Sequence, residues 1–179
     1  MVYVLLGTGF EEVEAIAPID LLRRAGISVL TVGVDGKSVT GGHGITVEAD
    51  ITLDQMDLTD LEMIVLPGGL GGVATARSSQ AALDALRFAY ENDKYVAAIC
   101  AGPTVLAELG IIGTSMATCY PGCEDGMGNA TVLNAACVTA GKLITGASAG
   151  CAIGFALALI TALKGSEVAQ QIEKQIVIR

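Results

Sequence analysis

The chain has 179 residues, of which 52% are hydrophobic and 16% are charged, which suits one domain with an aliphatic core. Its net charge of −9 argues against nucleic-acid binding through phosphate contacts and against a polybasic membrane anchor. The five cysteines are odd in number and form no Cys-x-x-Cys motif, which indicates free thiols and a reducing, cytoplasmic location.

Apolar runs alternate with helical patterns along the chain. Val2–Leu6 lacks the basic segment of a signal peptide and predicts a first strand. Apolar residues at helical spacing predict a helix over Glu11–Ala25, with a kink or a second helical start at Pro18. The remaining predicted elements are a strand over Ser28–Val34, a hairpin of Ser38–Thr40 and Ile45–Glu48, a strand over Met63–Leu66, a helix over Gln80–Asn92, a strand over Tyr95–Ile99, a helix over Pro103–Leu109, strands over Ser115–Cys119, Val132–Leu133, Cys137–Thr139 and Leu143–Thr145, and two C-terminal helices.

The stretch Leu143–Leu163 carries no charge and has the length of a transmembrane helix, about 20 residues. Its glycines and hydroxyl residues, and its division into a strand and a helix from about Ala147, favour a buried strand and helix instead. We therefore expect no association with a membrane.

The alternation of strands and helices predicts the α/β class, with a mostly parallel sheet and helices on both faces. No repeat or linker divides the chain, so residues 1–179 are expected to form a single domain. Ligands of such sheets bind beyond the carboxyl ends of the strands. Three segments leave strands at that edge, namely Gly7–Glu14, Pro67–Gly72 and Cys100–Thr104, and we expect them to converge on one pocket.

Cys100 follows the apolar run Tyr95–Ile99 and precedes small residues and a helical pattern. A strand, a tight turn and a helix with a reactive side chain at the turn form a nucleophile elbow. The positive end of the helix and its free backbone N–H groups would lower the pKa of the thiol and favour the thiolate. A buried and inert core cysteine is the alternative, because cysteine is often buried.

The two glycines after the strand Met63–Leu66 are candidate neighbours of this thiol. Gly68 and Gly69 can bring backbone N–H groups into the pocket without a Cβ in the way. Together with the N–H group of Ala101 they would form an oxyanion hole. A plain turn explains the same glycines.

Three acidic residues open the first predicted helix. Glu11 and Glu12 match the helix dipole and are expected in a solvated first turn. Glu14 lies three positions after Glu11 and two after Glu12, so its side chain points in a different direction. If it faces the pocket, its carboxyl group and the Cys100 thiolate share one proton, which the carboxyl group holds and donates to sulfur. Glu14 is therefore the candidate acid–base residue.

His43 is the only histidine, so a Cys–His pair within the chain would have to use it, although it lies in a hairpin far from Cys100 in sequence. A contact made across a dimer interface is the alternative. Cys119 and Cys123 are spaced Cys-x-x-x-Cys, with Cys137 further along, which makes a zinc site only a second interpretation. We expect no metal and no cofactor.

Four segments together resemble the ThiJ/PfpI superfamily over nearly the whole chain, and within it most closely the branch of the parkinsonism-associated protein deglycase. They are Gly9–Glu14, Pro18–Gly26, Val65–Gly69 and Ala97–Pro103. The resemblance implies a flavodoxin-like three-layer sandwich that is usually a homodimer. It also implies that Cys100 is the family's reactive, oxidisable cysteine, that Glu14 is its glutamate partner, and that Gly69 and Ala101 supply backbone donors around the sulfur.

The chain departs from the family pattern near these residues. Many relatives have a histidine before the proline that follows the next strand, whereas this chain has Tyr120 before Pro121. An arginine in the hairpin of close relatives corresponds to His43. The protease-like branch has histidine after its cysteine, whereas Ala101 follows Cys100, which disfavours a peptidase.

The leading hypothesis is a cysteine-dependent enzyme that acts on small aldehydes or glycated amines, as a glutathione-independent glyoxalase or a deglycase. The second is a non-enzymatic redox sensor or stress-response chaperone that uses the same Cys100, which the absence of the family histidine at Tyr120 favours. The third is a phosphosugar or nucleotide binder in which Gly7–Gly9 cradles a phosphate.

Overall fold

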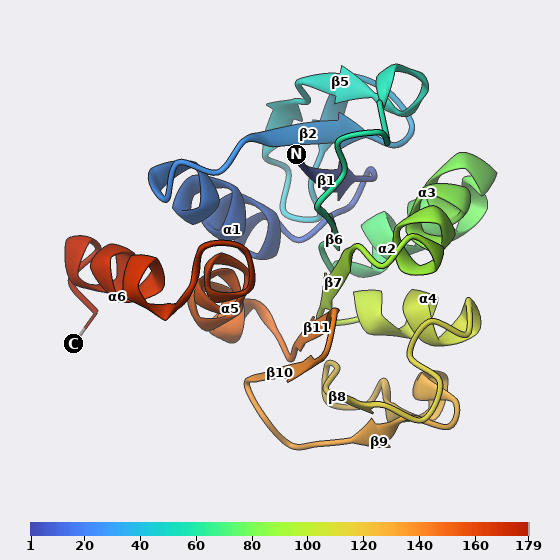
Figure 1. The fold of residues 1–179 in the computed structure, drawn as a ribbon. Coiled ribbons are helices and arrows are strands. Elements are labelled where there is room, and N and C mark those ends of the chain that lie inside the picture. The colour runs from blue at the N-terminus through green and yellow to red at the C-terminus, as the bar shows by residue number, and fades with distance from the viewer. Residues whose placement is uncertain (179) are drawn as a thin grey trace.

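Seven strands form the central sheet of the computed structural model, which describes residues 1–178 (Figure 1). Their order is β10-β11-β7-β6-β1-β2-β5, and all neighbours are parallel except β10 and β11. The strands are β1 (Val2–Leu6), β2 (Val29–Gly33), β5 (Ile51–Thr52), β6 (Met63–Leu66), β7 (Tyr95–Ile99), β10 (Cys137–Ala140) and β11 (Leu143–Gly146). This confirms the predicted α/β fold, and the order β2-β1-β6-β7-β11 is that of a flavodoxin-like sheet.

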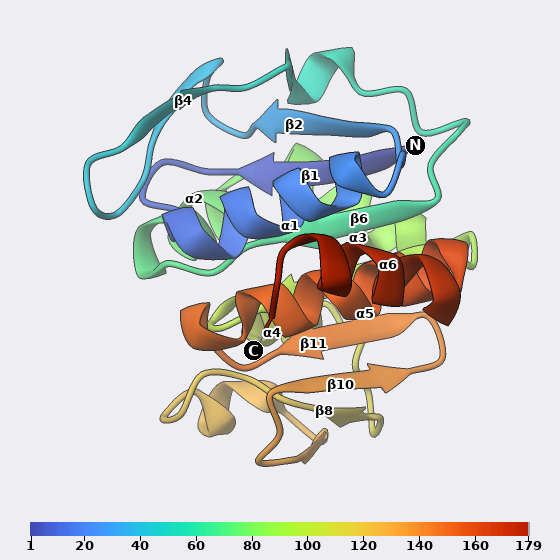
Figure 2. The same cartoon turned by 90° about the vertical axis from the view of Figure 1, so that its left-hand side faces the viewer.

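Helices cover both faces of the sheet (Figures 1 and 2). One face carries α1 (Glu12–Arg24), α5 (Ala152–Lys164) and α6 (Ser166–Gln175). The other face carries α2 (Leu70–Ser78), α3 (Gln80–Glu91) and α4 (Gly102–Glu108). Each face has its own aliphatic cluster, because side chains alternate between the two faces of a strand: Val4 and Leu6 pack on the α1 side, and Tyr3 and Leu5 on the α3 side.

Two small sheets lie outside the central one. The hairpin of β3 (Ser38–Thr40) and β4 (Thr46–Glu48) confirms the prediction for this region. The strands β8 (Met116–Ala117) and β9 (Thr131–Val132) pair with each other in parallel. The predicted strand Ser115–Cys119 is thus shorter than expected and does not join the central sheet.

The structure also differs from the predicted elements in α1 and α2. Helix α1 continues without a break through Pro18, so no second helix starts there. Helix α2 was not predicted, because its start contains Gly71 and Gly72, which are poor helix formers. Packing explains these glycines: a Cβ at Gly72 would lie 2.7 Å from the Cα atom of Phe10, so only glycine lets α2 approach the segment before α1 this closely.

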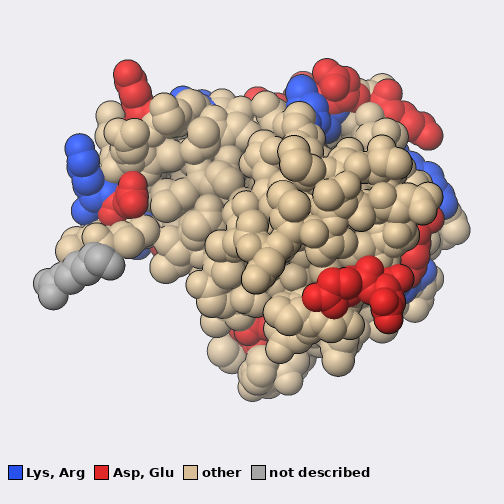
Figure 3. All heavy atoms as spheres, turned by 90° about the horizontal axis from the view of Figure 1, so that it is seen from below, with Lys and Arg blue, Asp and Glu red and all other residues tan. Residues whose placement is uncertain are grey.

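The uncharged stretch Leu143–Leu163 forms β11 and most of α5, as predicted. Within residues 1–178, no helix combines the length and the apolar character needed to cross a membrane. Charged side chains are sparse on the face shown in Figure 3, which consists mostly of uncharged residues with acidic and basic groups near its margin.

The sheet positions the candidate site through its topological switch. The chain leaves β1 for β2 on one side and later returns to β6 on the other side of β1, so the carboxyl ends of β1 and β6 lie next to each other. Strand β7 is the next neighbour of β6. A crevice at such a switch point is where doubly wound sheets bind ligands. The segments after β1, β6 and β7 are the three that were predicted to converge.

Candidate active site

Cys100 occupies a strained elbow at the end of β7. Its φ angle is +64°, in the left-handed region that residues with a Cβ rarely adopt. Two backbone hydrogen bonds hold it there: the Cys100 N–H donates to the Gly146 carbonyl at 2.9 Å, and the Tyr120 N–H donates to the Cys100 carbonyl at 2.8 Å. The thiol is only partly exposed. This geometry is that of a nucleophile elbow, with cysteine at the position of the reactive residue.

Glu14 extends from the first turn of α1 to this elbow. It is 1% exposed, and its Oε2 accepts a hydrogen bond from the Gly68 N–H at 3.0 Å. Within the part of the chain that the structure describes, its buried Oε1 has no hydrogen-bond partner. An unpartnered buried carboxyl oxygen is costly unless it carries a proton or meets a ligand.

Gly68 lets the carboxyl group and the cysteine meet. A Cβ at this position would overlap both Oε2 of Glu14 and Cβ of Cys100. Gly69 has a φ of +86° and directly precedes α2. Its N–H and that of Ala101 both lower the pKa of the Cys100 thiol. The structure thus brings together Cys100, Glu14, Gly68, Gly69 and Ala101.

Burial dominates the titration of the two acidic groups. It raises the pKa of Glu14 to about 7, against the lowering effect of the thiol and of the Gly68 N–H. Burial, followed by the negative charge of Glu14, raises the pKa of Cys100 to about 12. The N–H groups of Gly69 and Ala101 do lower the pKa of the thiol, but by less, so the predicted net lowering is wrong. Because the two groups interact, the pair keeps one proton at neutral pH and above, where two isolated acids with ordinary pKa values would begin to lose both.

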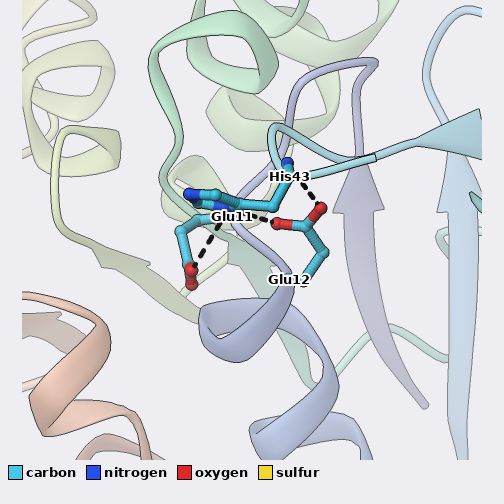
Figure 4. Close-up of side chains that lie close together, drawn as sticks. All are labelled: Glu11, Glu12 and His43. Carbon is cyan, nitrogen blue, oxygen red and sulfur yellow. Dashed lines mark hydrogen bonds and ion pairs between the residues drawn. The ribbon is translucent and has the colours of Figure 1, made fainter. Parts of the chain in front are cut away.

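Glu12 has a role that the sequence did not reveal. It was expected in a solvated turn, but it is 5% exposed, and its carboxylate binds the loop of the β3–β4 hairpin (Figure 4). Its Oε1 accepts the His43 N–H at 2.7 Å, and its Oε2 lies 2.8 Å from Nδ1 of His43. These hydrogen bonds lower the pKa of Glu12 even though burial raises it, and they raise the pKa of His43. The sequence feature that accommodates this contact is Gly41, because a Cβ at that position would overlap the Glu12 carboxylate.

His43 therefore pairs with Glu12 rather than with Cys100. Its side chain is 74% exposed, and Nδ1 also lies 4.0 Å from Oε1 of Glu11. Glu11, Glu12 and His43 form the one cluster of three potential metal ligands among residues 1–178. Existing hydrogen bonds account for its carboxylates, because Glu11 also caps α1 by accepting the Glu14 N–H at 2.8 Å.

The remaining candidate positions take no direct part in the thiol–carboxyl pair. Tyr120 contacts the elbow through its backbone, and its side chain is 48% exposed. The predicted phosphate cradle is occupied by the protein itself: the N–H groups of Thr8, Gly9 and Phe10 donate to Asp35, Thr40 and Gly7. Cys119, Cys123 and Cys137 are free thiols, and the described residues do not unite them in a three-ligand cluster.

A doubly wound sheet with a cysteine elbow at its switch point and a buried glutamate beside it defines a class of α/β proteins that carry cysteine at a nucleophile elbow. The sequence model of the DJ-1/PfpI family matches residues 1–162, and the chain belongs to this family.

Individual relatives agree with this assignment. The dj-1beta protein of Drosophila melanogaster is 36% identical over 98% of this chain and 95% of its own length. Its crystal structure has a TM-score of 0.95, with 35% identity over 99% of this chain and 97% of that one. A deglycase of Pyrococcus horikoshii is 34% identical over 73% of this chain and 78% of its own length. Oxidized Toxoplasma gondii DJ-1 has a TM-score of 0.92, with 32% identity over 98% of this chain and 97% of that one.

The raised pKa of Glu14 predicts how stability depends on pH. From its ordinary pKa of 4.5 up to about 7, the unfolded chain releases a proton that the folded protein keeps, so the wild-type free energy of unfolding falls as pH rises. Glu14→Gln lacks this titration. Its stability relative to wild type should therefore rise by about 2 kcal/mol between about pH 4.5 and 7 and then level off.

Urea unfolding of both proteins at several pH values measures this difference. The exposed Glu173→Gln in α6 is the control and should follow the wild type. A constant difference between Glu14→Gln and wild type across this range would contradict the raised pKa.

Proposed function

We propose that the protein is a cysteine-dependent enzyme that converts small reactive carbonyl compounds, as a glutathione-independent glyoxalase. The observation that carries this proposal is the Cys100 thiol beside the buried Glu14 carboxyl group, whose Oε1 has no hydrogen-bond partner within the described residues. Above about pH 7 the pair holds one proton. The N–H groups of Gly69 and Ala101 lower the pKa of the thiol, whereas the carboxyl group accepts one N–H, that of Gly68, which favours the thiolate with a protonated Glu14.

In the first step, the thiolate adds to the aldehyde carbon of methylglyoxal. The carbonyl electron pair moves to oxygen, and the resulting oxyanion takes the proton from Glu14 to give a hemithioacetal. Backbone N–H groups of Gly69 and Ala101 support negative charge at this place.

In the next step, the Glu14 carboxylate removes the hydrogen from the former aldehyde carbon to give an enediol, the hydroxyl proton moves to the neighbouring oxygen, and Glu14 returns its proton to the neighbouring carbon. The hemithioacetal becomes a lactoyl thioester on Cys100. Water then cleaves the thioester, so lactate leaves and the thiol is restored. The overall reaction adds one water molecule to methylglyoxal, and therefore needs no redox cofactor.

The name of the Pyrococcus relative supports a second substrate class at the same site, glycated amines. In that case Cys100 would displace the amine from the carbinol carbon of the adduct, the amine would leave with a proton, and the resulting hemithioacetal would isomerise to the thioester and be hydrolysed in the same way. The free state of all five cysteines agrees with a reducing cytoplasm, where we place this activity.

The enzymatic proposal predicts that the wild type forms lactate from methylglyoxal and that activity rises with pH around 7, as the pair loses its first proton. Cys100→Ser should reduce the rate to background, and Glu14→Gln should reduce it about 100-fold or more, since it cannot carry the proton. Cys123→Ser is the control and should keep full activity. If wild type and Cys100→Ser form lactate at equal rates, the protein is not a glyoxalase.

Tyr120 favours the second function, a redox sensor or stress-response chaperone. The expected family histidine is replaced by a residue whose phenol is half exposed, so no imidazole stands next to the elbow to assist turnover. A thiolate in reach of solvent reacts with peroxide, first to the sulfenate and then to the sulfinate, each step adding one oxygen and releasing one water. A protonated Glu14 would hydrogen-bond the product. The existence of an oxidized Toxoplasma relative agrees with this chemistry.

Mild peroxide should therefore add two oxygen atoms at Cys100 before it modifies the other four cysteines, as measured by intact mass and peptide mapping. Glu14→Gln should slow this oxidation, because it lacks the ionisable partner that shares the proton. Oxidation of Cys123 or Cys151 ahead of Cys100 would rule out a sensor based on Cys100.

We further infer that the protein forms a homodimer. Apolar side chains project from the start of α1 and from the hairpin that Glu12 holds against it: Val13 is 51% exposed, Ile16 40% and Ile45 57%. Such side chains gathered from two elements are typical of an interaction surface. Sedimentation should give about twice the chain mass of 18.2 kDa, and Ile16→Glu should give the single-chain mass. Tyr90→Glu, at an exposed position of α3, should leave the dimer intact, and a monomeric wild type would contradict the inference.

A further inference from the structure

Arg77 joins the ends of two helices behind the candidate site. It lies in the last turn of α2, and its guanidinium group contacts the last residue of α4 with two nitrogens. The Nε donates to Oε2 of Glu108 at 3.0 Å, and Nη2 lies 2.7 Å from Oε1 of the same carboxylate. This is the planar, two-point contact that arginine makes and lysine cannot.

The same guanidinium group continues toward the interior. Its Nη2 donates to Oγ1 of Thr104 at 2.6 Å. Thr104 is 6% exposed, and its hydroxyl donates in turn to the Ala101 carbonyl at 2.6 Å. A hydroxyl that accepts from a cation becomes a stronger donor, so the two hydrogen bonds reinforce each other. The chain of contacts thus runs from Arg77 through Thr104 to the residue next to Cys100.

These helices begin with the residues that surround the sulfur. Gly69 directly precedes α2, and Ala101 directly precedes α4. The N–H groups of both lower the pKa of the Cys100 thiol. The relative position of α2 and α4 therefore decides whether both N–H groups reach the sulfur together, and Arg77 links the two helices.

We propose that Arg77 is a positioning residue for the candidate site: it ties α2 to α4 through Glu108 and Thr104, and so holds the N–H groups of Gly69 and Ala101 around the Cys100 sulfur. The inference rests on the proposed function, because it concerns the same thiolate. It differs from an ordinary surface ion pair by the buried Thr104 contact. The exposed pair of Arg87 and Asp84 on α3 lacks such a contact and provides a matched control.

The test is the rate at which iodoacetamide alkylates Cys100, measured by peptide mapping between about pH 5 and 9. Arg77→Gln should move the midpoint of the pH profile upward by about half a unit and slow alkylation about threefold at neutral pH, since the thiolate loses part of its stabilisation. Arg77→Lys keeps the charge but not the two-point contact, and should give a smaller shift. Arg87→Gln should match the wild type.

Glu108→Gln separates the Thr104 contact from the ion pair. It removes the carboxylate charge but leaves the hydrogen bond from Arg77 to Thr104 available, so the Cys100 midpoint should move upward by less than in Arg77→Gln. Thermal unfolding of each variant identifies those that fold. If Arg77→Gln does not fold, Arg77→Lys decides in its place.

A wild-type midpoint in the folded Arg77→Gln variant would overturn the proposal, and so would a shift in Arg87→Gln as large as that in Arg77→Gln, because the effect would then not depend on the link between α2 and α4. Alkylation does not require turnover. A protein that shows the expected midpoints but forms no lactate would refute the enzymatic function and leave the role of Arg77 standing. A wild-type Cys100 that resists alkylation up to about pH 9 would refute both.

Discussion

The arrangement of the site depends on a carboxyl group buried beside a thiol. Glu14 is 1% exposed, yet one of its oxygens finds no hydrogen bond within the described chain. Such a group is stable only with a proton or a polar ligand nearby. The surrounding structure makes the burial unavoidable: the side chain at position 68 is absent, and the Gly68 N–H fixes the other oxygen. Cys100, at a φ of +64°, is held in a conformation that aims its sulfur at the same place. The fold thus maintains two unfavourable features side by side, a buried carboxyl oxygen without a hydrogen bond and a cysteine in a left-handed backbone conformation, which is typical of a functional site.

The coupling of the two groups gives a thiol with a raised pKa a route to the thiolate that the proposed functions require. Considered alone, Cys100 is a poor nucleophile, because burial and the Glu14 charge both oppose its ionisation. Considered with Glu14, the pair loses its first proton near pH 7, and the remaining proton can reside on either group. The N–H groups of Gly69 and Ala101 affect where this proton resides, since they stabilise negative charge on the sulfur and so leave the proton on the carboxyl group. Burial and the Glu14 carboxyl group thus oppose the thiolate, and the N–H groups of Gly69 and Ala101 favour it.

Much of this site could be predicted from the sequence, because its members are fixed by local patterns. An apolar strand followed by Cys100 and small residues defines the elbow, and Gly68 and Gly69 follow another strand. The role of Glu12 could not be predicted, since its partner His43 lies 31 residues away and a helix-opening acid has a sufficient local explanation. Helix α2 was missed because tertiary packing against Phe10 outweighs the low propensity of Gly71 and Gly72. The predicted lowering of the Cys100 pKa was wrong, because the burial that raises this pKa depends on the whole fold, whereas the helix start that would lower it can be seen in the sequence.

The two candidate functions share every residue of the site, so they differ in what reaches the sulfur and what happens next. Addition to an aldehyde and oxidation by peroxide both begin with the same thiolate. Turnover further requires that Glu14 carry protons between two carbon atoms, for which its pKa of about 7 is well matched at neutral pH. A sensor requires only that Glu14 remain protonated and hydrogen-bond the oxidised sulfur. A pKa near neutrality serves both, but only the enzyme needs the carboxyl group to change its protonation state in each cycle. The two functions therefore differ in whether Glu14 gains and loses its proton in each cycle, since both use the same cysteine.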